Sequence, residues 1–155
     1  MKKNLALSVT PPLNSNCKSD SQNMSRKEAE KNTIIAIQAT MFSNNFPGKV
    51  LAKFNNNRTV LDFLITRMQE ANLVSRIAIV TSDLDSDLPI VEEGKRLGVE
   101  VIRGSHDDLI KRFIFAADVL KVNYLILIPG SNPLLDLEAL DNLLDAHHSG
   151  DWEYS

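Results

Sequence analysis

The cation best placed to bind an anion is Lys49, at the end of the sequence Phe46-Pro47-Gly48-Lys49. Pro47 fixes its own φ angle and Gly48 tolerates a positive φ angle, so the pair is typical of a tight turn that presents the next residue. A lysine presented in this way can neutralise the charge of a phosphate group. Spacing alone does not separate this role from an ordinary connection with a solvated lysine.

The element before this turn is a short apolar, β-branched run at residues 34–37. Such a run is typical of a strand that is buried on both faces. A polar loop at residues 38–45 separates the run from the turn. Open α/β sheets bind nucleotides where loops follow the carboxyl ends of their strands. The order of strand, polar loop and cationic turn therefore predicts a nucleotide site at the end of the first strand.

Apolar runs at residues 77–80, 99–102 and 124–128 predict three more strands, each buried like the first. Helical patterns alternate with them, and their apolar stripes are Val60, Leu61, Leu64, Ile65 and Met68; Leu109, Phe113, Ala116 and Leu120; and Leu137, Leu140 and Leu144. Residues 89–97 form the remaining predicted helix. Four strands alternating with four helices predict an α/β fold, a Rossmann-like parallel sheet with helices on both faces.

Polar residues mark the expected starts of these helices. Thr59 lies three residues before Asp62, and Ser105 lies three residues before Asp108, which is the spacing of a capping box. Asp87 is expected to cap the helix at residues 89–97. On the helix after Thr59, Arg67 and Glu70 are expected on the solvated face. His147 and His148 close the last predicted helix, where we expect an exposed helix end and no metal site.

Two loops carry further charged groups. Arg103-Gly104-Ser105 could bind an anion through the guanidinium group and backbone N–H groups, although the neighbouring Asp107 and Asp108 oppose an anion by their charge. Asp83, Asp85 and Asp87 alternate as at the start of a calcium-binding loop. Leu88 replaces the glycine that such a loop needs, and Gly94 replaces its last glutamate, which argues against calcium.

Length and composition fit one globular domain of 155 residues, with 43% apolar and 24% charged residues and a net charge of −3. Residues 1–31 are rich in Ser and Asn and lack aromatic residues, so we expect a flexible leader and no nucleic-acid arm. Cys17 is the only cysteine, which fits a reducing cytoplasm. No apolar stretch approaches the length of a membrane span, so we expect a cytoplasmic protein without membrane or nucleic-acid partners.

Several short motifs, in order along residues 33–155, resemble the spore-coat-polysaccharide branch of the acylneuraminate cytidylyltransferase family. These motifs are Gln38-Ala39-x-Met41, Pro47-Gly-Lys-Val-Leu51, Thr81-Ser82, Pro89-Ile-Val-Glu92, Leu97-Gly-Val99, Arg103-Gly-Ser105-x-Asp-Asp108 and Pro133-Leu-Leu-Asp136. The resemblance implies that residues 32–155 are the nucleotide-binding half of a glycosyltransferase-A-like nucleotidyltransferase domain, with the C-terminal sugar-binding half absent.

The same resemblance implies an activity and a set of site residues. Members of the family join a sugar acid to CTP with the help of Mg²⁺, releasing pyrophosphate and forming a CMP-sugar for surface polysaccharides. Lys49 is the implied catalytic residue, and a homodimer is compatible with the family. The implied nucleotide-binding residues are Gln38, Ala39, Ser43, Lys49, Thr81, Ser82, Arg103 and Ser131.

The chain departs from the family where charge is handled. Thr40 replaces the first loop arginine, Phe42 replaces a glycine, and Ser131 replaces the aspartate that binds metal, so no metal ligand is assigned. Each charged contact to a bound anion contributes about 1.5–3 kcal/mol. We therefore expect a weakly active or inactive chain. The alternatives are a catalytically silent nucleotide-binding or protein-interaction module, and a flavodoxin-like or receiver-like domain with an unrelated ligand.

Overall fold

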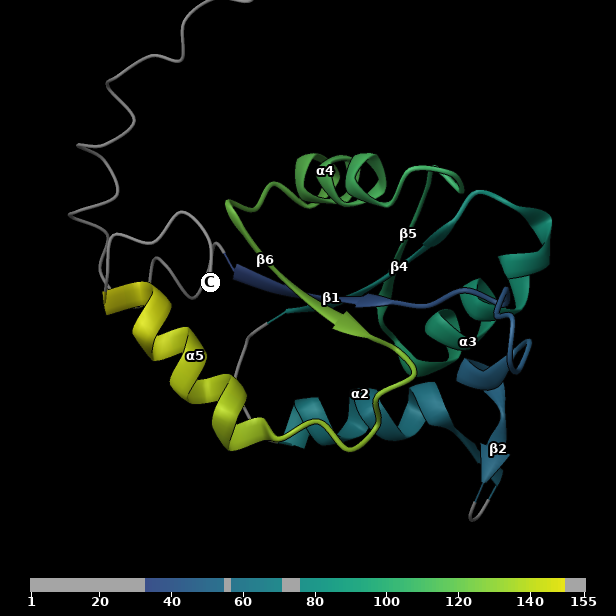
Figure 1. Cartoon of the computed structure of the whole chain (residues 1–155), viewed down its shortest axis with the longest axis horizontal. Helices are drawn as coiled ribbons and strands as arrows, with labels where there is room; N and C mark the ends of the chain where they lie inside the picture. The colour runs from purple at the N-terminus through teal and green to yellow at the C-terminus, as the bar shows by residue number, and fades with distance from the viewer. Residues whose placement is uncertain (1–32, 55–56, 71–75, 150–155) are drawn as a thin grey trace, which may run out of the picture.

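The structure, a computed structural model, describes residues 33–54, 57–70 and 76–149. At its centre lies a parallel four-stranded sheet with the strand order β5-β4-β1-β6 (Figure 1). The strands are β1 (Thr33–Gln38), β4 (Ile77–Ser82), β5 (Glu100–Gly104) and β6 (Tyr124–Pro129). The predicted α/β fold and its four strands are confirmed. The expected leader, residues 1–31, lies outside the described residues.

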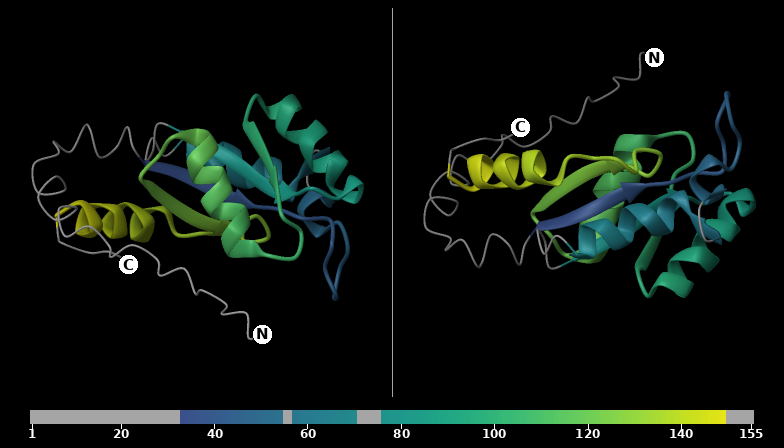
Figure 2. Two further views of the ribbon diagram at one scale, coloured as in Figure 1. Left: turned by 90° about the horizontal axis from the view of Figure 1, so that it is seen from above. Right: turned by 90° about the horizontal axis from the view of Figure 1, so that it is seen from below.

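Helices cover both faces of this sheet, as the two views of Figure 2 show. α4 (Leu109–Leu120) lies on one face, and α2 (Val60–Glu70), α3 (Leu88–Leu97) and α5 (Leu137–Ser149) lie on the other. None of the described helices is long and apolar enough to cross a membrane.

The central strand β1 contributes to a separate hydrophobic core on each face. Ile34 and Ala36 pack into the core under α4, whereas Ile35 and Ile37 pack into the larger core under α2, α3 and α5. All four side chains are almost completely buried. Because successive side chains of a strand point to opposite faces, an uninterrupted apolar run is what this position requires. The prediction of a doubly buried first strand is confirmed.

The last strand does not follow that expectation. β6 pairs with β1 and has no second neighbour among the described strands, so it forms an edge of the sheet. Ile128 is buried, but 45% of the surface of Leu127 is exposed. The prediction that residues 124–128 are buried on both faces is therefore wrong. An apolar run does not by itself reveal whether a strand has one neighbour or two.

A small hairpin before α2 was not predicted. β2 (Lys53–Phe54) pairs in antiparallel fashion with β3 (Arg58–Thr59), and Asn57 between them has a φ angle of 67°. α2 then begins as expected, because the Thr59 hydroxyl accepts a hydrogen bond of 3.0 Å from the N–H of Asp62. Two-residue strands are too short to leave a recognisable alternation in the sequence.

The start of α4 differs from its prediction. Asp108, not Ser105, is the N-cap residue, and its carboxylate accepts a hydrogen bond of 2.9 Å from the N–H of Lys111. Ser105 supports this cap by accepting from the N–H of Asp108. Ala116 and Leu120 are buried, but Leu109 lies in the first turn and is 40% exposed, so its assignment to the buried stripe is wrong.

Two further expectations concern α2 and α5. Arg67 is half-buried and donates a hydrogen bond of 2.5 Å to the carbonyl oxygen of Pro133, so its assignment to a solvated face is wrong. This bond ties the loop after β6 to α2. At the start of α5 the Asp136 carboxylate accepts from two backbone N–H groups, as a cap should. The side chains of Glu70, Leu144, His147 and His148 lie outside what the structure describes.

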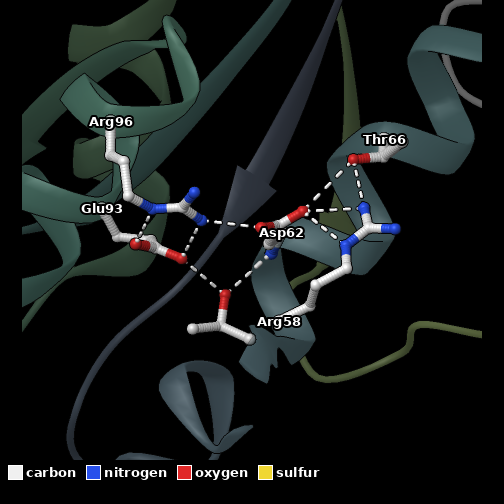
Figure 3. A network of polar contacts seen from close by, with 6 residues as sticks. Arg58, Asp62, Thr66, Glu93 and Arg96 are labelled. Atoms are coloured by element: carbon white, nitrogen blue, oxygen red, sulfur yellow. Dashed lines mark hydrogen bonds and ion pairs between the residues drawn. The ribbon is translucent and has the colours of Figure 1, made fainter. Parts of the chain in front are cut away.

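An ionic network joins the hairpin to α2 and α3 (Figure 3). The Asp62 carboxylate accepts from Arg58 at 2.8 Å and from Arg96 at 2.7 Å, and Arg96 also binds Glu93 at 2.8 Å. Glu93 in turn accepts from the Thr59 hydroxyl at 2.7 Å. Burial acts to raise the pKa of Asp62, but the hydrogen bonds from Arg96 and Arg58 outweigh burial and lower it. The bonds from Arg96 likewise lower the pKa of Glu93.

Candidate functional site

Loops from all four strands of the sheet meet at its carboxyl edge. Because the strands are parallel, they all end at this edge. Hydrogen bonds join the strand ends directly. The N–H of Gly130, after β6, donates to the carbonyl oxygen of Gln38 at 2.7 Å, and the N–H of Ala39 donates to that of Val80 at 3.2 Å. Gln38 is half-buried and Ala39 is buried, so both lie beneath the loops at this edge of the sheet.

Gly130 has a specific reason to be glycine. A Cβ atom added there would lie 2.9 Å from the carbonyl oxygen of Gln38 and 3.3 Å from the side chain of Ile37. Only a residue without a side chain lets β6 turn away so close to β1. The next residue, Ser131, is exposed above this contact.

The loop after β1 folds back on itself to place Lys49. The N–H of Gly48 donates to the carbonyl oxygen of Met41 at 2.8 Å, and Gly48 has a φ angle of 72°. The predicted tight turn is confirmed. Lys49 begins the short helix η3 (Lys49–Leu51) and is half-buried. Within the described part of the chain, no hydrogen bond or ion pair holds its ammonium group.

Small polar and aromatic side chains line the same loop. The Ser43 hydroxyl accepts from the N–H of Phe46 at 3.4 Å, and the Thr40 hydroxyl donates to the carbonyl oxygen of Phe42 at 3.3 Å. The two phenylalanines are 69% and 57% exposed, Phe42 more than Phe46. These exposed aromatic rings were not predicted as site residues, because the sequence does not show which aromatic side chains leave the core.

Asp87 joins the loop after β1 to the end of β4. Its Oδ1 atom accepts from the N–H of Met41 at 2.7 Å, and its Oδ2 atom accepts from Thr81 Oγ1 at 3.0 Å and Ser82 Oγ at 2.5 Å. Asp87 is the N-cap residue of α3, as predicted, but its side chain accepts no hydrogen bond from the helix and binds the loop after β1 and the end of β4 instead. Burial acts to raise the pKa of Asp87, but the bonds from Ser82, Met41 and Thr81 outweigh burial and lower it.

This bonding decides what Thr81 and Ser82 can contribute. Both side chains are buried, and both hydroxyl groups donate to Asp87. Each hydroxyl has a single proton to donate, and that proton is already used. Thr81 and Ser82 therefore shape the edge from beneath and do not offer hydroxyl donors to a ligand.

Arg103 is held by the loop after β4. Its guanidinium group donates to the carbonyl oxygens of Ser82 at 3.3 Å, Asp83 at 2.7 Å and Leu84 at 3.0 Å. These bonds join β5 to the β4–α3 loop, which contains the short helix η5 (Asp85–Asp87). The fixed fork of an arginine suits several acceptors at once. The structure thus shows a structural use for the guanidinium group at the position where the sequence suggests an anion contact.

The described residues do not form a site that would hold Mg²⁺. They contain no group of three or more His, Cys, Asp or Glu side chains placed to share a metal ion. Mg²⁺ favours carboxylate oxygens, yet the most central carboxylate at this edge, Asp87, already accepts N–H and O–H donors on both oxygens.

The sequence and fold match those of known proteins. The family profile described as cytidylyltransferase matches residues 34–155. This chain belongs to the cytidylyltransferase family. Membership of this family replaces the flavodoxin-like and receiver-like alternatives, and it confirms the resemblance seen in the sequence.

Relatives and solved structures give the same result. Over 126 residues the chain is 32% identical to the spore coat polysaccharide biosynthesis protein SpsF of Bacillus subtilis, covering 79% of this chain and 52% of that protein. A cytidylyltransferase structure from Leptospira borgpetersenii is 31% identical, with a TM-score of 0.72 over 77% of this chain and 50% of that one. The chain thus spans about half the length of these cytidylyltransferase relatives.

A more distant structure shares the fold. The CMP:2-keto-3-deoxy-manno-octonic acid synthetase complexed with CTP is 18% identical to this chain, with a TM-score of 0.65. The match covers 76% of this chain and 48% of the synthetase.

Proposed function

We propose that this chain binds CTP at the carboxyl edge of its sheet, with Lys49 facing the phosphates, as part of nucleotide-sugar formation for a surface polysaccharide. The observation that carries the proposal is the position of Lys49. Its ammonium group has no protein partner among the described residues, and the turn at Gly48 holds it beside the end of β1. A cation without a protein partner is what a bound triphosphate requires. A solved cytidylyltransferase-fold protein with CTP, and a relative named for polysaccharide biosynthesis, support this ligand and this role.

The exposure of the other side chains at this edge indicates which of them can contact the proposed ligand. Ser43 and Ser131 lie in loops at the same edge and complete the set that can reach the ligand. Thr81, Ser82 and Arg103 act through the shape of the edge, because their side chains bind other parts of the protein. Gln38 and Ala39 contribute to the same shape through their backbone hydrogen bonds to the neighbouring strand ends. The exposed rings of Phe42 and Phe46 offer flat apolar surfaces against which a base can stack.

Nucleotide transfer by this chain is weak or absent in the proposal. Transfer to a sugar acid needs strong stabilisation of charge on the phosphates. Thr40 and Ser131 stand where the family resemblance places an arginine and a metal-binding aspartate, and the described residues form no acidic metal cluster. A catalytically silent nucleotide-binding module is therefore the second candidate, and it predicts the same CTP site without turnover.

Calorimetric titration with CTP tests the site. Lys49→Ala should weaken CTP binding by about 10- to 100-fold, which corresponds to the loss of one charged contact. Lys53→Ala, an exposed lysine in the nearby hairpin, is the matched control and should leave the affinity unchanged. Equal binding by the parental chain and by Lys49→Ala would contradict the proposed site.

A pyrophosphate-release assay separates the two candidates. The chain is incubated with CTP, Mg²⁺ and a sugar acid, and pyrophosphate is measured against a blank without protein. Release that disappears in Lys49→Ala supports an active transferase, whereas CTP binding without release supports the silent module. Absence of CTP binding in the parental chain would exclude both.

A further inference from the structure

We propose that Asp87 is a positioning residue for Lys49, acting through Met41. The carboxylate fixes the path of the first loop, and the loop in turn directs the lysine toward the phosphates. The ligand in this inference rests on the proposed function, but the positioning itself is a property of the protein alone.

The connection runs through two consecutive hydrogen bonds, between Asp87 and Met41 and between Met41 and Gly48, the residue before Lys49. Asp87 Oδ1 accepts from the N–H of Met41 at 2.7 Å. The carbonyl oxygen of Met41 accepts from the N–H of Gly48 at 2.8 Å. The methyl carbon Cε of Met41 also lies 3.1 Å from the position of a Cβ atom on Gly48, so the two residues are packed as well as bonded. Lys49 follows directly, and its N–H donates to the carbonyl oxygen of Phe46 at 3.3 Å.

The other carboxylate oxygen anchors this connection to the sheet. Oδ2 accepts from Thr81 Oγ1, from Ser82 Oγ and from the N–H of Ser82, all of which belong to β4. Asp87 is only 1% exposed. A buried carboxylate with three donors on one oxygen cannot turn without leaving several of them unsatisfied. Its second oxygen therefore holds the loop at a fixed place relative to β4.

The first loop has little else to hold it. Ala39, directly after β1, bonds Val80, and the other hydrogen bonds that residues 40–49 donate in the described structure are local: Thr40 to Phe42, Phe46 to Ser43, Gly48 to Met41 and Lys49 to Phe46. From residue 42 to residue 47 most side chains are exposed. The bond between Met41 and Asp87 is thus the long-range hydrogen bond of the segment that carries the lysine. Because an ordinary helix cap would bond α3 instead, the geometry favours positioning over capping.

Asp87→Asn tests this inference, with Asp62→Asn as the matched control. Both aspartates are buried and accept several hydrogen bonds, but the Asp62 carboxylate binds Arg58, Thr66 and Arg96 and accepts no bond from the loop after β1. In Asp87→Asn an NH₂ group replaces one oxygen and must face either the N–H of Met41 or the donors of β4.

Two measurements are made on each variant. Backbone amide NMR resonances of Met41, Gly48 and Lys49 should shift in Asp87→Asn and stay in place in Asp62→Asn. CTP binding should weaken by about tenfold in Asp87→Asn and by less than about twofold in Asp62→Asn. In a Lys49→Ala background, Asp87→Asn should cost less than about twofold, because residues that act through one contact are not additive.

The outcomes separate this inference from the proposed function. Unshifted Met41 and Gly48 resonances, or the same loss of CTP affinity with and without Lys49, would overturn the positioning role. A parental chain that does not bind CTP would overturn the proposed function, and the resonances would still decide the positioning role. If Asp87→Asn does not fold, hydrogen exchange in the parental chain decides: protection of the Met41 amide supports the inference, and free exchange refutes it.

Discussion

The backbone N–H of Met41 donates to the carboxylate of Asp87 across 2.7 Å, although 46 positions separate the two residues in the chain. The bond joins the loop after β1 to the start of α3. It explains how a largely exposed loop keeps a defined path at the edge where the strands end. The predictions below concern the edge, the core and the charged groups that surround this contact.

Stability should fall in acid. Hydrogen bonds hold the pKa values of Asp62, Asp87 and Glu93 below their ordinary values in the folded chain. Unfolding restores the ordinary values, so below about pH 4 the unfolded state takes up more protons than the folded state. The stabilisation is complete above that pH and is lost as the pH falls through the folded values. Urea unfolding at pH 7, 5, 4 and 3 measures how the free energy of unfolding changes with pH.

The variant Asp62→Asn is the control for this pH dependence. Removing one of the three carboxylates should make the loss of stability between about pH 5 and pH 3 smaller. An unfolding free energy that does not change over this range in the parental chain would contradict the shifted pKa values.

Neighbouring residues of β6 should respond very differently to truncation. Ile128 is 3% exposed and packs in the core under α2 and α5, whereas Leu127 is 45% exposed. Ile128→Ala should lower the unfolding free energy by about 2–5 kcal/mol. Leu127→Ala should lower it by about 1 kcal/mol or less. Chemical denaturation measures both, and equal losses would show that β6 is not an edge strand.

Gly130→Ala should separate β6 from β1 at the site. The new Cβ atom would lie 2.9 Å from the carbonyl oxygen of Gln38, a backbone atom that cannot move aside easily. We expect a loss of about 1–3 kcal/mol in unfolding free energy. Ser131→Ala is the control, since Ser131 is exposed, and should change stability by about 0.5 kcal/mol or less. A thermally and chemically unchanged Gly130→Ala variant would contradict this close approach.

Removal of Mg²⁺ should not abolish CTP binding. The described residues form no cluster of three or more carboxylate, imidazole or thiol groups around a common point, so we expect the nucleotide phosphates to supply most of the ligands of a bound Mg²⁺. We expect EDTA to change the Kd of CTP by less than about threefold. The described residues offer no carboxylate cluster whose contact with Mg²⁺ would be lost when the ion is removed. Titrations with Mg²⁺ and with EDTA measure the ratio. Complete dependence on Mg²⁺ would show that the chain holds the metal itself.

Much of the fold is predictable because two kinds of pattern are strong in this sequence. The run at residues 34–37 has no polar interruption, and β1 indeed has a core on each face. The αL turn at Gly48 follows from the conformational freedom of glycine. The edge position of β6 was missed, since neighbour relations between strands are set by tertiary packing.

The site was harder to predict because the roles of its polar residues depend on long-range bonds. Asp87 has the sequence context of a helix cap, yet its oxygens bind Met41 and β4. Likewise, Arg103 has the context of an anion contact, yet it binds three carbonyl groups. Residue type and spacing placed these residues at or after the carboxyl ends of the strands, where the structure has them, and only the folded arrangement shows which groups are already bonded within the protein.

Among the described strands β6 has a neighbour on one side only, and this affects how the chain is expected to associate in solution. A strand with a neighbour on one side presents a row of backbone donors and acceptors that another strand can use. Leu127 in β6 is 45% exposed, and no residue of β6 carries a charged side chain that would discourage pairing with another strand. If this side is open in solution, self-association should grow with protein concentration, and Leu127→Lys should reduce it.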